Sequence, residues 1–353
     1  MSDAGVRFAA MRGRQGDRVV YILLPTNGQL IQRFTPETEP QDRRSQRALI
    51  PKHAEDIREY VVENRAEYVL GALTYAIDVE GSFEEFRTGS PFGELTLPGD
   101  AQIRSIDGQH RRVGIQQAIA LVADIAEDSM PVVLYVEDDL AKRRQMFSDM
   151  NWTPRKVSAS ENIAFDSRDP FSRAVQRLVE TNEFLRDRVE SQLARVQRGS
   201  SRLYTLGAVY DACRRLMLGP SGRIKSYSAN EEDILDRARR FFAVLTAARP
   251  ELASVTSATD VDELRKKSIL VSSTTLRVLA GAAYECIQHH RREGTTFAIE
   301  ELRGSLAQVD FSPDAELWLS AGFVTPGKAT PNARSQEVVQ ATKLLAAQLL
   351  GIR

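Results

Sequence analysis

The feature that most constrains the fold is a change of sequence pattern near Leu140. Before this residue, short runs rich in β-branched residues alternate with turn residues and with segments of helical spacing. After it, apolar residues recur at helical spacing, and no convincing strand follows. The 353 residues exceed the roughly 250 to 300 at which a single hydrophobic core stops growing. We therefore predict an α+β chain with a mixed-sheet domain over residues 1–160 and a mostly α-helical domain over residues 161–353, with the boundary between Asp139 and Asp166.

Apolar runs and turn residues predict the elements of the N-terminal domain. A Gly16-Asp17 turn before the apolar run that ends at Pro25 predicts a β-hairpin. Further strands are predicted over residues 68–79, 95–97, 103–106 and 130–139, and helices over 51–64 and from His110 onward. The continuous apolar run of the last strand is typical of a strand inside a sheet. The helix after His110 is expected to turn Ile115 toward the sheet and Arg112 away from it.

Helices of the C-terminal domain are predicted over residues 171–198 (one or two helices), 202–218, 230–247, 273–291 and 335–350. The helix over 230–247 is long enough to read DNA, but its N-terminal end, which such helices usually point into the groove, is acidic. We therefore expect it to be a packing helix. Trp152 and Trp318 are expected to anchor packing.

Composition and charge narrow the function classes. Hydrophobic residues make up 42% of the chain and charged residues 27%, as in ordinary globular proteins. No apolar run approaches the ~18 residues that span a bilayer, and the N-terminus lacks a continuous apolar signal core, so we expect a cytoplasmic protein with no membrane partner. The formal net charge is -1, yet residues 140–225 carry 17 Lys and Arg against 9 Asp and Glu. This asymmetry indicates an anionic partner for the middle segment.

A polar turn lies where the strand over 103–106 gives way to a helix, and it consists of Asp107, Gly108, Gln109, His110 and Arg111. The first N–H groups of a helix lack partners within it and favour an anion. Gly108 permits a close approach or a positive φ, and Arg111 can bind a phosphate with two N–H groups. His110 can donate or transfer a proton, Gln109 offers an amide for a base or ribose, and Asp107 can orient its neighbours. These residues are compatible with three alternatives: a phosphate-binding turn, a catalytic centre, or a polar turn with only a structural role.

Two kinds of chemistry are poorly supported by the motif. The turn contains no nucleophile, because Ser105 precedes it and no cysteine is near, which weakens any mechanism with a covalent intermediate. Only four histidines exist, and none forms a short ligand pair with acidic residues, so no metal ligands are predicted. Acid–base catalysis would fall to Asp107 and His110 only if the protein is an enzyme.

The stretch "SIDGQHRRVGIQQAIA", followed by "MPVVLYV", resembles the DGQHR-domain family and in particular the DndB proteins of bacterial DNA phosphorothioation systems. It is similar, more distantly, to the ParB and sulfiredoxin superfamily, which holds nucleotide phosphates at a Gly-x-x-Arg turn after a strand. "RRQMFSDMNWTPRKVSAS", from Arg143 to Ser160, resembles the pattern that follows the sheet strand in DGQHR proteins, with Asn151 as its most specific polar residue. Sulfiredoxins have a catalytic cysteine where this chain has Gln109, so the resemblance implies phosphate binding without sulfur reduction. The resemblance to DGQHR proteins extends to many individual residues from about Gln46 to Ser160. In the helical remainder of the chain it is only a general similarity of pattern.

The resemblance implies a ParB/sulfiredoxin-like mixed sheet and a phosphate or nucleotide site. The shared site that the resemblance implies consists of Asp107, Gly108, Gln109, His110, Arg111 and Asn151, of which the last five bind the phosphate or nucleotide. The implied ligand is ATP or another nucleotide, with the need for a metal left open. It also implies a DNA-binding transcriptional repressor of the modification genes. The implied partners are double-stranded DNA, other DNA-modification proteins and further copies of the chain.

Basic residues near the end of the sheet domain are predicted to contact DNA phosphates, namely Lys142, Arg143, Arg144, Arg155 and Lys156. The alternative function is an NTP hydrolase or a DNA-nicking enzyme. In that case Asp107 and His110 would perform acid–base chemistry and Arg111 would stabilise developing charge.

Overall fold

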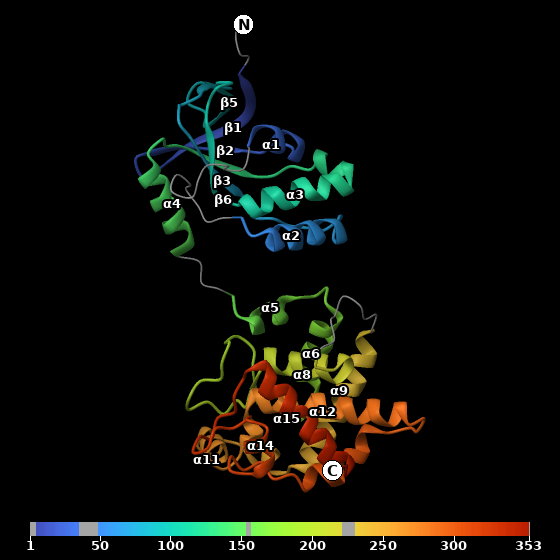
Figure 1. The fold of residues 1–353 in the computed structure, drawn as a ribbon. Coiled ribbons are helices and arrows are strands. Elements are labelled where there is room, and N and C mark those ends of the chain that lie inside the picture. Colours follow the sequence, from blue (N-terminus) through green and yellow to red (C-terminus); the bar gives the residue numbers. More distant parts are fainter. Residues whose placement is uncertain (1–4, 35–48, 153–156, 221–229, 353) are drawn as a thin grey trace. The chain divides into compact units, whose positions relative to one another are not determined.

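The computed structural model describes residues 5–34, 49–152, 157–220 and 230–352. The chain divides into two compact units, residues 1–155 and residues 156–353. We call them the sheet unit and the helical unit and describe each by itself. The fold is mixed α+β, as predicted, with the strands of the large sheet in the first unit and mostly helices in the second (Figure 1).

A mixed sheet forms the centre of the sheet unit, with the strand order β4-β5-β1-β2-β7-β3-β6 among the described residues. Neighbouring strands are antiparallel except for β3 and β7, which are parallel. The strands are β1 (Val6–Gln15), β2 (Arg18–Leu23), β3 (Leu73–Ile77), β4 (Ser82–Glu85), β5 (Phe92–Leu97), β6 (Ile103–Asp107) and β7 (Val132–Val136).

The hairpin and the interior strand confirm two of the sequence predictions. Gln15 pairs with Arg18 across the Gly16-Asp17 turn, where Gly16 has a φ of 60°. Strand β7 lies between β2 and β3, which explains its continuous apolar run. The strand predicted over 68–79 is shorter, and β4 was not predicted, because "SFEE" at a sheet edge lacks apolar alternation.

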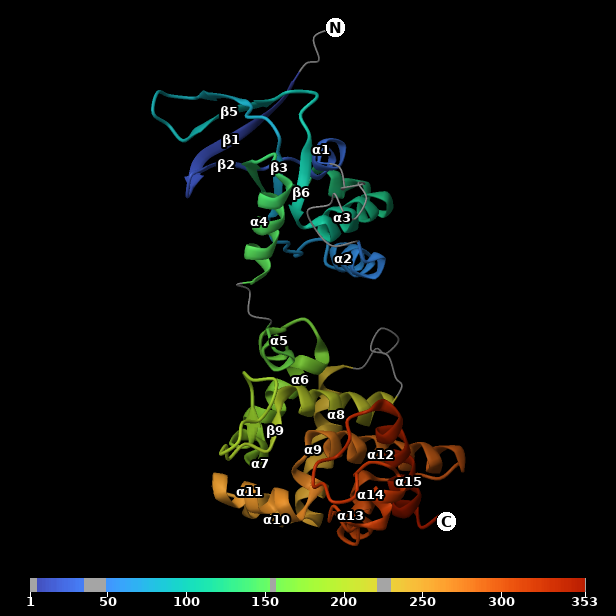
Figure 2. The ribbon, with the colours of Figure 1, turned by 60° about the vertical axis from the view of Figure 1, so that its left-hand side comes forward.

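Helices cover both faces of this sheet. Helices α1 (Asn27–Arg33), α2 (Pro51–Glu63) and α3 (Gln109–Leu121) lie on one side and α4 (Leu140–Trp152) on the other (Figures 1 and 2). Successive residues of β3 point to opposite faces, so Tyr75 joins the core beneath α3, whereas Ala76 packs with Met146 of α4. Strand β6 and helix α3 thereby hold the polar turn against this core.

The burial of Arg112 contradicts the expectation that it faces away from the core. Its side chain is buried, its Nε donates to the carbonyl of Phe34, and its Nη2 donates to the carbonyl of Ile31 at 2.9 Å. These carbonyls lie at the C-terminal end of α1, where a positive charge is favourable. Helical spacing could not reveal this role, because the partners lie about 80 residues earlier in the chain.

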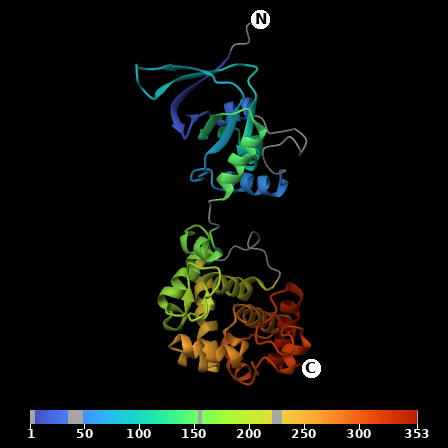
Figure 3. The ribbon, with the colours of Figure 1, turned by 90° about the vertical axis from the view of Figure 1, so that its left-hand side faces the viewer.

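The helical unit is built from packed helices with one buried hydrophobic core. Its described helices are α5 (Ala159–Phe165), α6 (Pro170–Thr181), α7 (Glu183–Arg186), α8 (Leu206–Leu218), α9 (Glu231–Ala248), α10 (Glu251–Ser254), α11 (Ala258–Lys267), α12 (Ser273–Arg292), α13 (Leu302–Ala307), α14 (Glu316–Ser320) and α15 (Ser335–Leu350). Figure 3 shows the orange α12 and the red α15 within this unit. A two-residue pair, β8 (Val189–Glu190) and β9 (Tyr204–Thr205), is the small exception to the predicted absence of strands.

Most helix predictions in this unit are confirmed. One of them needs correction, and so does the prediction for Trp152, which lies at the end of α4 in the sheet unit. Helix α9 packs through Phe241 and Phe242, as expected of a packing helix. The segment predicted over 171–198 forms helix only as far as Arg186. Trp318 is fully buried, as predicted, but Trp152 is 88% exposed and anchors nothing in the described core. None of the described helices is both long and apolar enough to span a membrane.

Candidate phosphate-binding site

The turn between β6 and α3 depends on a glycine. Gly108 is the N-cap residue of α3 and has a φ of 97° and a ψ of 12°, a left-handed conformation that side chains disfavour. A Cβ atom added there would lie 2.3 Å from Cδ2 of Leu73 and 3.1 Å from Nη2 of Arg111. Only glycine therefore lets this turn lie against the buried Leu73 while the guanidinium of Arg111 covers it.

An ion pair joins the two ends of the motif. Nη2 of Arg111 lies 2.5 Å from Oδ2 of Asp107 and also donates to the carbonyl of Ala72 at 3.2 Å. Both charged side chains are half-buried. Asp107 thus orients Arg111, one of the roles that the sequence left open. The pair fixes a positively charged group beside the first turn of α3.

His110 is held as a neutral imidazole. Its Nε2 accepts a hydrogen bond of 2.9 Å from the backbone N–H of Ile50, which places the ring proton on Nδ1. Burial lowers the pKa of His110, and the neighbouring His53, whose ring centroid is 5.5 Å away, lowers it further against the opposing charge of Asp107. His110 therefore offers an Nδ1–H donor, whereas its accepting nitrogen is already occupied.

The motif lines a cleft of about 450 Å³ between three helices. Gly108, Gln109, His110 and Arg111 form one wall together with Asp107, and α4 contributes Phe147 and Asn151. The structure thus brings together all six residues assigned to the site from the sequence. Gln109 is buried, and the side-chain nitrogen of Asn151 donates to the carbonyl of Phe147 at 2.7 Å.

Helix α2 forms a second wall that the sequence reasoning missed. It contributes His53, Asp56 and Ile57 to the cleft, and its N-cap residue Ile50 lines the cleft as well. Gly114 of α3 lets the two helices approach, because a Cβ atom there would lie 2.7 Å from Cγ2 of Ile57. The sequence feature that would have revealed this wall is the spacing of His53 and Asp56. They are three residues apart, so they lie on one polar face of a helix that was correctly predicted.

The residues predicted to contact DNA do not share one environment. Lys142 and Arg144 are exposed on α4, and the ammonium group of Lys142 lies 3.9 Å from Glu137. Arg143 is buried, and its Nη1 donates to the carbonyl of Asp138 at 2.7 Å, so its guanidinium does not join the exposed pair. Arg155 and Lys156 lie outside the described residues.

The described residues contain no group of three or more His, Cys, Asp or Glu side chains arranged to hold a metal ion. The donors of the cleft are instead a guanidinium, an imidazole N–H and backbone N–H groups, which suit an anion. Cys213 and Cys286 are free, buried thiols in the helical unit.

Comparison with protein families matches residues 8–352 to the DndB family, described as DNA-sulfur modification-associated. Because the match covers nearly the whole chain, the protein belongs to this family. No curated protein and no solved structure matches the chain. The likeness of the sheet unit to the ParB and sulfiredoxin fold therefore stays a prediction.

Proposed function

We propose that the protein is a DNA-binding regulator of a DNA phosphorothioate-modification system and acts as a transcriptional repressor of the modification genes. We further propose that its DGQHR cleft binds a phosphate group of ATP, of another nucleotide or of DNA. Membership of a DNA-sulfur modification-associated family supports the link to the modification system. Other DNA-modification proteins and further copies of the chain are proposed as partners.

The observation that carries the proposed phosphate site is the beginning of α3. Among the described residues, no side chain caps this helix by a hydrogen bond, and its first turn contains no acidic residue. The backbone N–H groups of such a turn and the positive end of the helix dipole favour an anion. Arg111 and His110 line the same cleft and add a charged donor and a neutral donor.

The proposed DNA contacts lie on the same helix as one wall of the cleft. Lys142 and Arg144 are exposed near the beginning of α4, and Asn151 lines the cleft near its end. Arg144 and Asn151 are seven positions apart, close to two helical turns, so they share one face of α4 and lie about 10 Å apart along its axis. The proposed path of the nucleic acid backbone therefore runs from Arg144 to the cleft along this face, and Lys142 adds positive charge from the opposite face.

Gel-shift titration on the promoter upstream of the protein's own gene, at several salt concentrations, tests the regulatory proposal. We expect tighter binding to this promoter than to a shuffled duplex of the same length. The double variant Lys142→Glu, Arg144→Glu is expected to lower the affinity for DNA at least about 10-fold. It should also make the slope of the logarithm of the binding constant against the logarithm of the salt concentration shallower by about 2. Lys266→Glu is the matched control, because Lys266 is an exposed lysine of α11 that pairs with Glu263. This variant should bind the promoter with unchanged affinity. Equal, weak binding to every duplex would contradict the regulatory proposal.

The alternative proposal, an NTP hydrolase or DNA-nicking enzyme, has less support from the geometry. A general base needs a free lone pair, yet Nε2 of His110 accepts from Ile50, and the carboxylate of Asp107 is paired with Arg111. The enzyme proposal predicts phosphate release from ATP or nicking of plasmid DNA that disappears in His110→Ala. Absent turnover, or turnover unchanged in that variant, would reject it.

A further inference from the structure

The positive charge of residues 140–225 is only partly matched by carboxylates in the helical unit. Arg173 and Arg177 lie 2.8 Å and 2.7 Å from carboxylate oxygens of Glu231. The loop between β8 and β9 differs from this helical surface. Its residues 191–203 contain three arginines and no aspartate or glutamate. These arginines, which we call the loop arginines, are Arg195, Arg198 and Arg202.

Contacts at both ends hold this loop on the helical unit. Val189 of β8 pairs with Tyr204 of β9, and both side chains are buried. The hydroxyl group of Ser158, at the beginning of α5, donates to the carbonyl of Gln192 at 2.7 Å. Figures 1 and 2 show the loop in yellow-green at the margin of the helical unit. The loop therefore has a defined position from which its side chains face solvent.

Apolar side chains of the loop face the unit, whereas its arginines are accessible. Leu193 and Val196 are half-buried, but Arg195 and Arg198 are exposed. Within the described part of the chain, the guanidinium groups of Arg195 and Arg198 make no hydrogen bond and no ion pair. Arg202 is half-buried, and its Nη1 donates at 3.2 Å to a backbone carbonyl rather than to a carboxylate. The positive charge of the loop arginines is thus available to an anionic partner.

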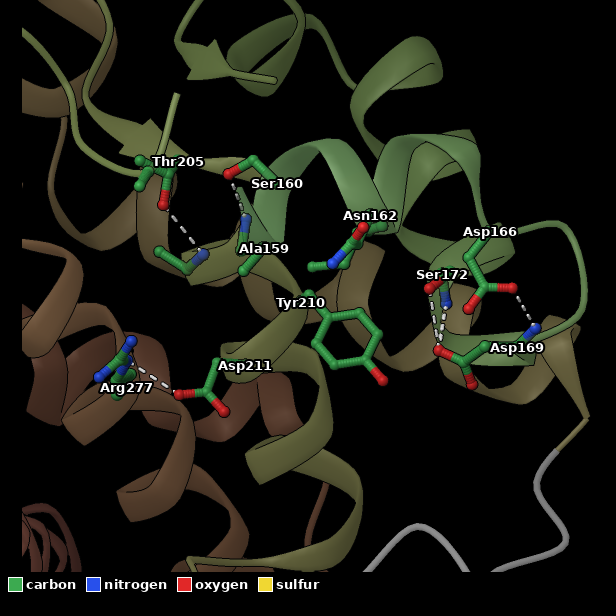
Figure 4. Close-up of a pocket in the computed structure, with 14 residues that line it drawn as sticks. Ala159, Ser160, Asn162, Asp166, Asp169, Ser172, Thr205, Tyr210, Asp211 and Arg277 are labelled. Atoms are coloured by element: carbon green, nitrogen blue, oxygen red, sulfur yellow. Dashed lines mark hydrogen bonds and ion pairs between the residues drawn. The ribbon is translucent and has the colours of Figure 1, made fainter. Parts of the chain in front are cut away.

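The cleft next to this loop does not offset that charge. Its volume is about 590 Å³, and the loop, Thr205 of β9 and helices α5, α6 and α8 line it. Asp211 pairs with Arg277 at 2.9 Å, whereas Asp166 and Asp169 have no ion pair among the described residues. Figure 4 shows these two carboxylates at the end of the cleft away from Thr205. The unmatched negative charge therefore lies away from the beginning of α8, where the loop ends.

Helix α11 borders the loop without extending its charge through two of its cations. Nη2 of Arg265 donates to the carbonyl of Arg202 at 3.2 Å. However, Arg265 lies 3.4 Å from Asp262. Lys266 lies 2.6 Å from Glu263. Because carboxylates match these two cations, the candidate surface consists of the loop arginines.

We propose that this loop is a second contact with the DNA backbone, in addition to the contact proposed for α4. This inference rests on the proposed DNA binding and names a further surface for it. Duplex DNA carries one negative charge per about 1.7 Å of its axis, so several phosphates can meet the loop arginines. A lipid surface would call for large exposed apolar side chains, and the loop exposes none. Phosphate contacts carry no sequence information, so the loop raises affinity for every duplex alike.

Fluorescence anisotropy of the full chain, on the promoter duplex and on the shuffled duplex at several salt concentrations, tests the proposal. The double variant Arg195→Ser, Arg198→Ser removes exposed side chains without partners, so it should stay folded. We expect about 10-fold lower affinity for both duplexes and an unchanged preference for the promoter. The slope of the logarithm of the binding constant against the logarithm of the salt concentration should become shallower by about 2. Unchanged affinity and slope, where the wild-type chain binds DNA, would overturn this inference and leave the proposed function standing.

Arg291→Ser, Arg303→Ser is the matched control, because it removes the same charge from exposed side chains of α12 and α13. This variant should change neither the affinity nor the slope. Equal losses in the two double variants would overturn the inference, because the effect would then follow net charge. A wild-type chain that binds both duplexes equally would contradict the regulatory proposal, yet a loss confined to the loop variant would still support the loop contact. A chain that binds neither duplex would overturn both.

An acidic protein is the other kind of polyanion that suits the loop arginines, and polyglutamate is the probe for it. We expect the wild-type chain and the loop variant to bind polyglutamate equally. Polyglutamate binding that the loop variant loses, together with unchanged DNA affinity, would overturn the proposal in favour of an acidic protein partner.

Discussion

Replacing Gly108 with alanine tests whether the DGQHR turn requires glycine. With a φ of 97°, an alanine at this position costs about 1–2 kcal/mol in backbone strain. Its Cβ atom would lie 2.3 Å from Cδ2 of the fully buried Leu73, so the turn or the core must shift, at a further cost of about 1–3 kcal/mol. Gly108→Ala is therefore expected to lower the free energy of unfolding of the sheet unit by about 2–5 kcal/mol.

Gly89→Ala is the matched control for this measurement. Gly89 also has a positive φ, 77°, but no described atom lies within 4 Å of an added Cβ. It should cost only the backbone contribution of about 1–2 kcal/mol. Amide hydrogen exchange is measured on the full chain at increasing urea concentrations. Exchange in the peptides that contain β3 and β6 then reports the unfolding of the sheet unit separately from that of the helical unit. Equal destabilisation by the two variants would refute the contact between the turn and Leu73.

Two further predictions concern neighbours of this turn. Arg112→Met is expected to lower the free energy of unfolding of the sheet unit by about 2–4 kcal/mol, because it removes buried charge-assisted hydrogen bonds to the end of α1. Arg14→Met, on the exposed hairpin, is the control. In the same urea assay it should change the free energy of unfolding by no more than about 0.5 kcal/mol. Between the ordinary pKa of 6.5 and the lower folded pKa of His110, the unfolded chain binds more protons than the folded chain. Stability should therefore fall as the pH drops through this window, and urea titrations at several pH values should show that His110→Gln loses this part of the pH dependence.

Local patterns in the sequence were sufficient to predict those helices and strands whose buried residues recur at a single regular spacing. The hairpin at Gly16-Asp17, the interior strand β7 and helices such as α12 and α15 were predicted because apolar spacing and turn residues act within a few positions. The strand-to-helix turn at Gly108 was predictable for the same reason, since a strand, a glycine and a helix are adjacent in the chain.

Features that depend on distant partners were missed. Arg112 was expected to point away from the sheet, because nothing nearby in the sequence shows that its guanidinium binds carbonyls at the C-terminal end of α1. His53 enters the cleft only because α2 packs against α3 at Gly114. Trp152 is exposed, although its size suggested an anchor. In each case the position is decided by contacts between elements, which a single sequence does not contain.

The central claim is that the DGQHR turn holds a phosphate group. A crystal structure of the full chain grown with ATP tests it most directly. We predict a phosphate oxygen about 3 Å from the first backbone N–H groups of α3 and within reach of the guanidinium of Arg111. An ordered ATP molecule elsewhere in the protein, with no phosphate at the Gly108 turn, would contradict the account.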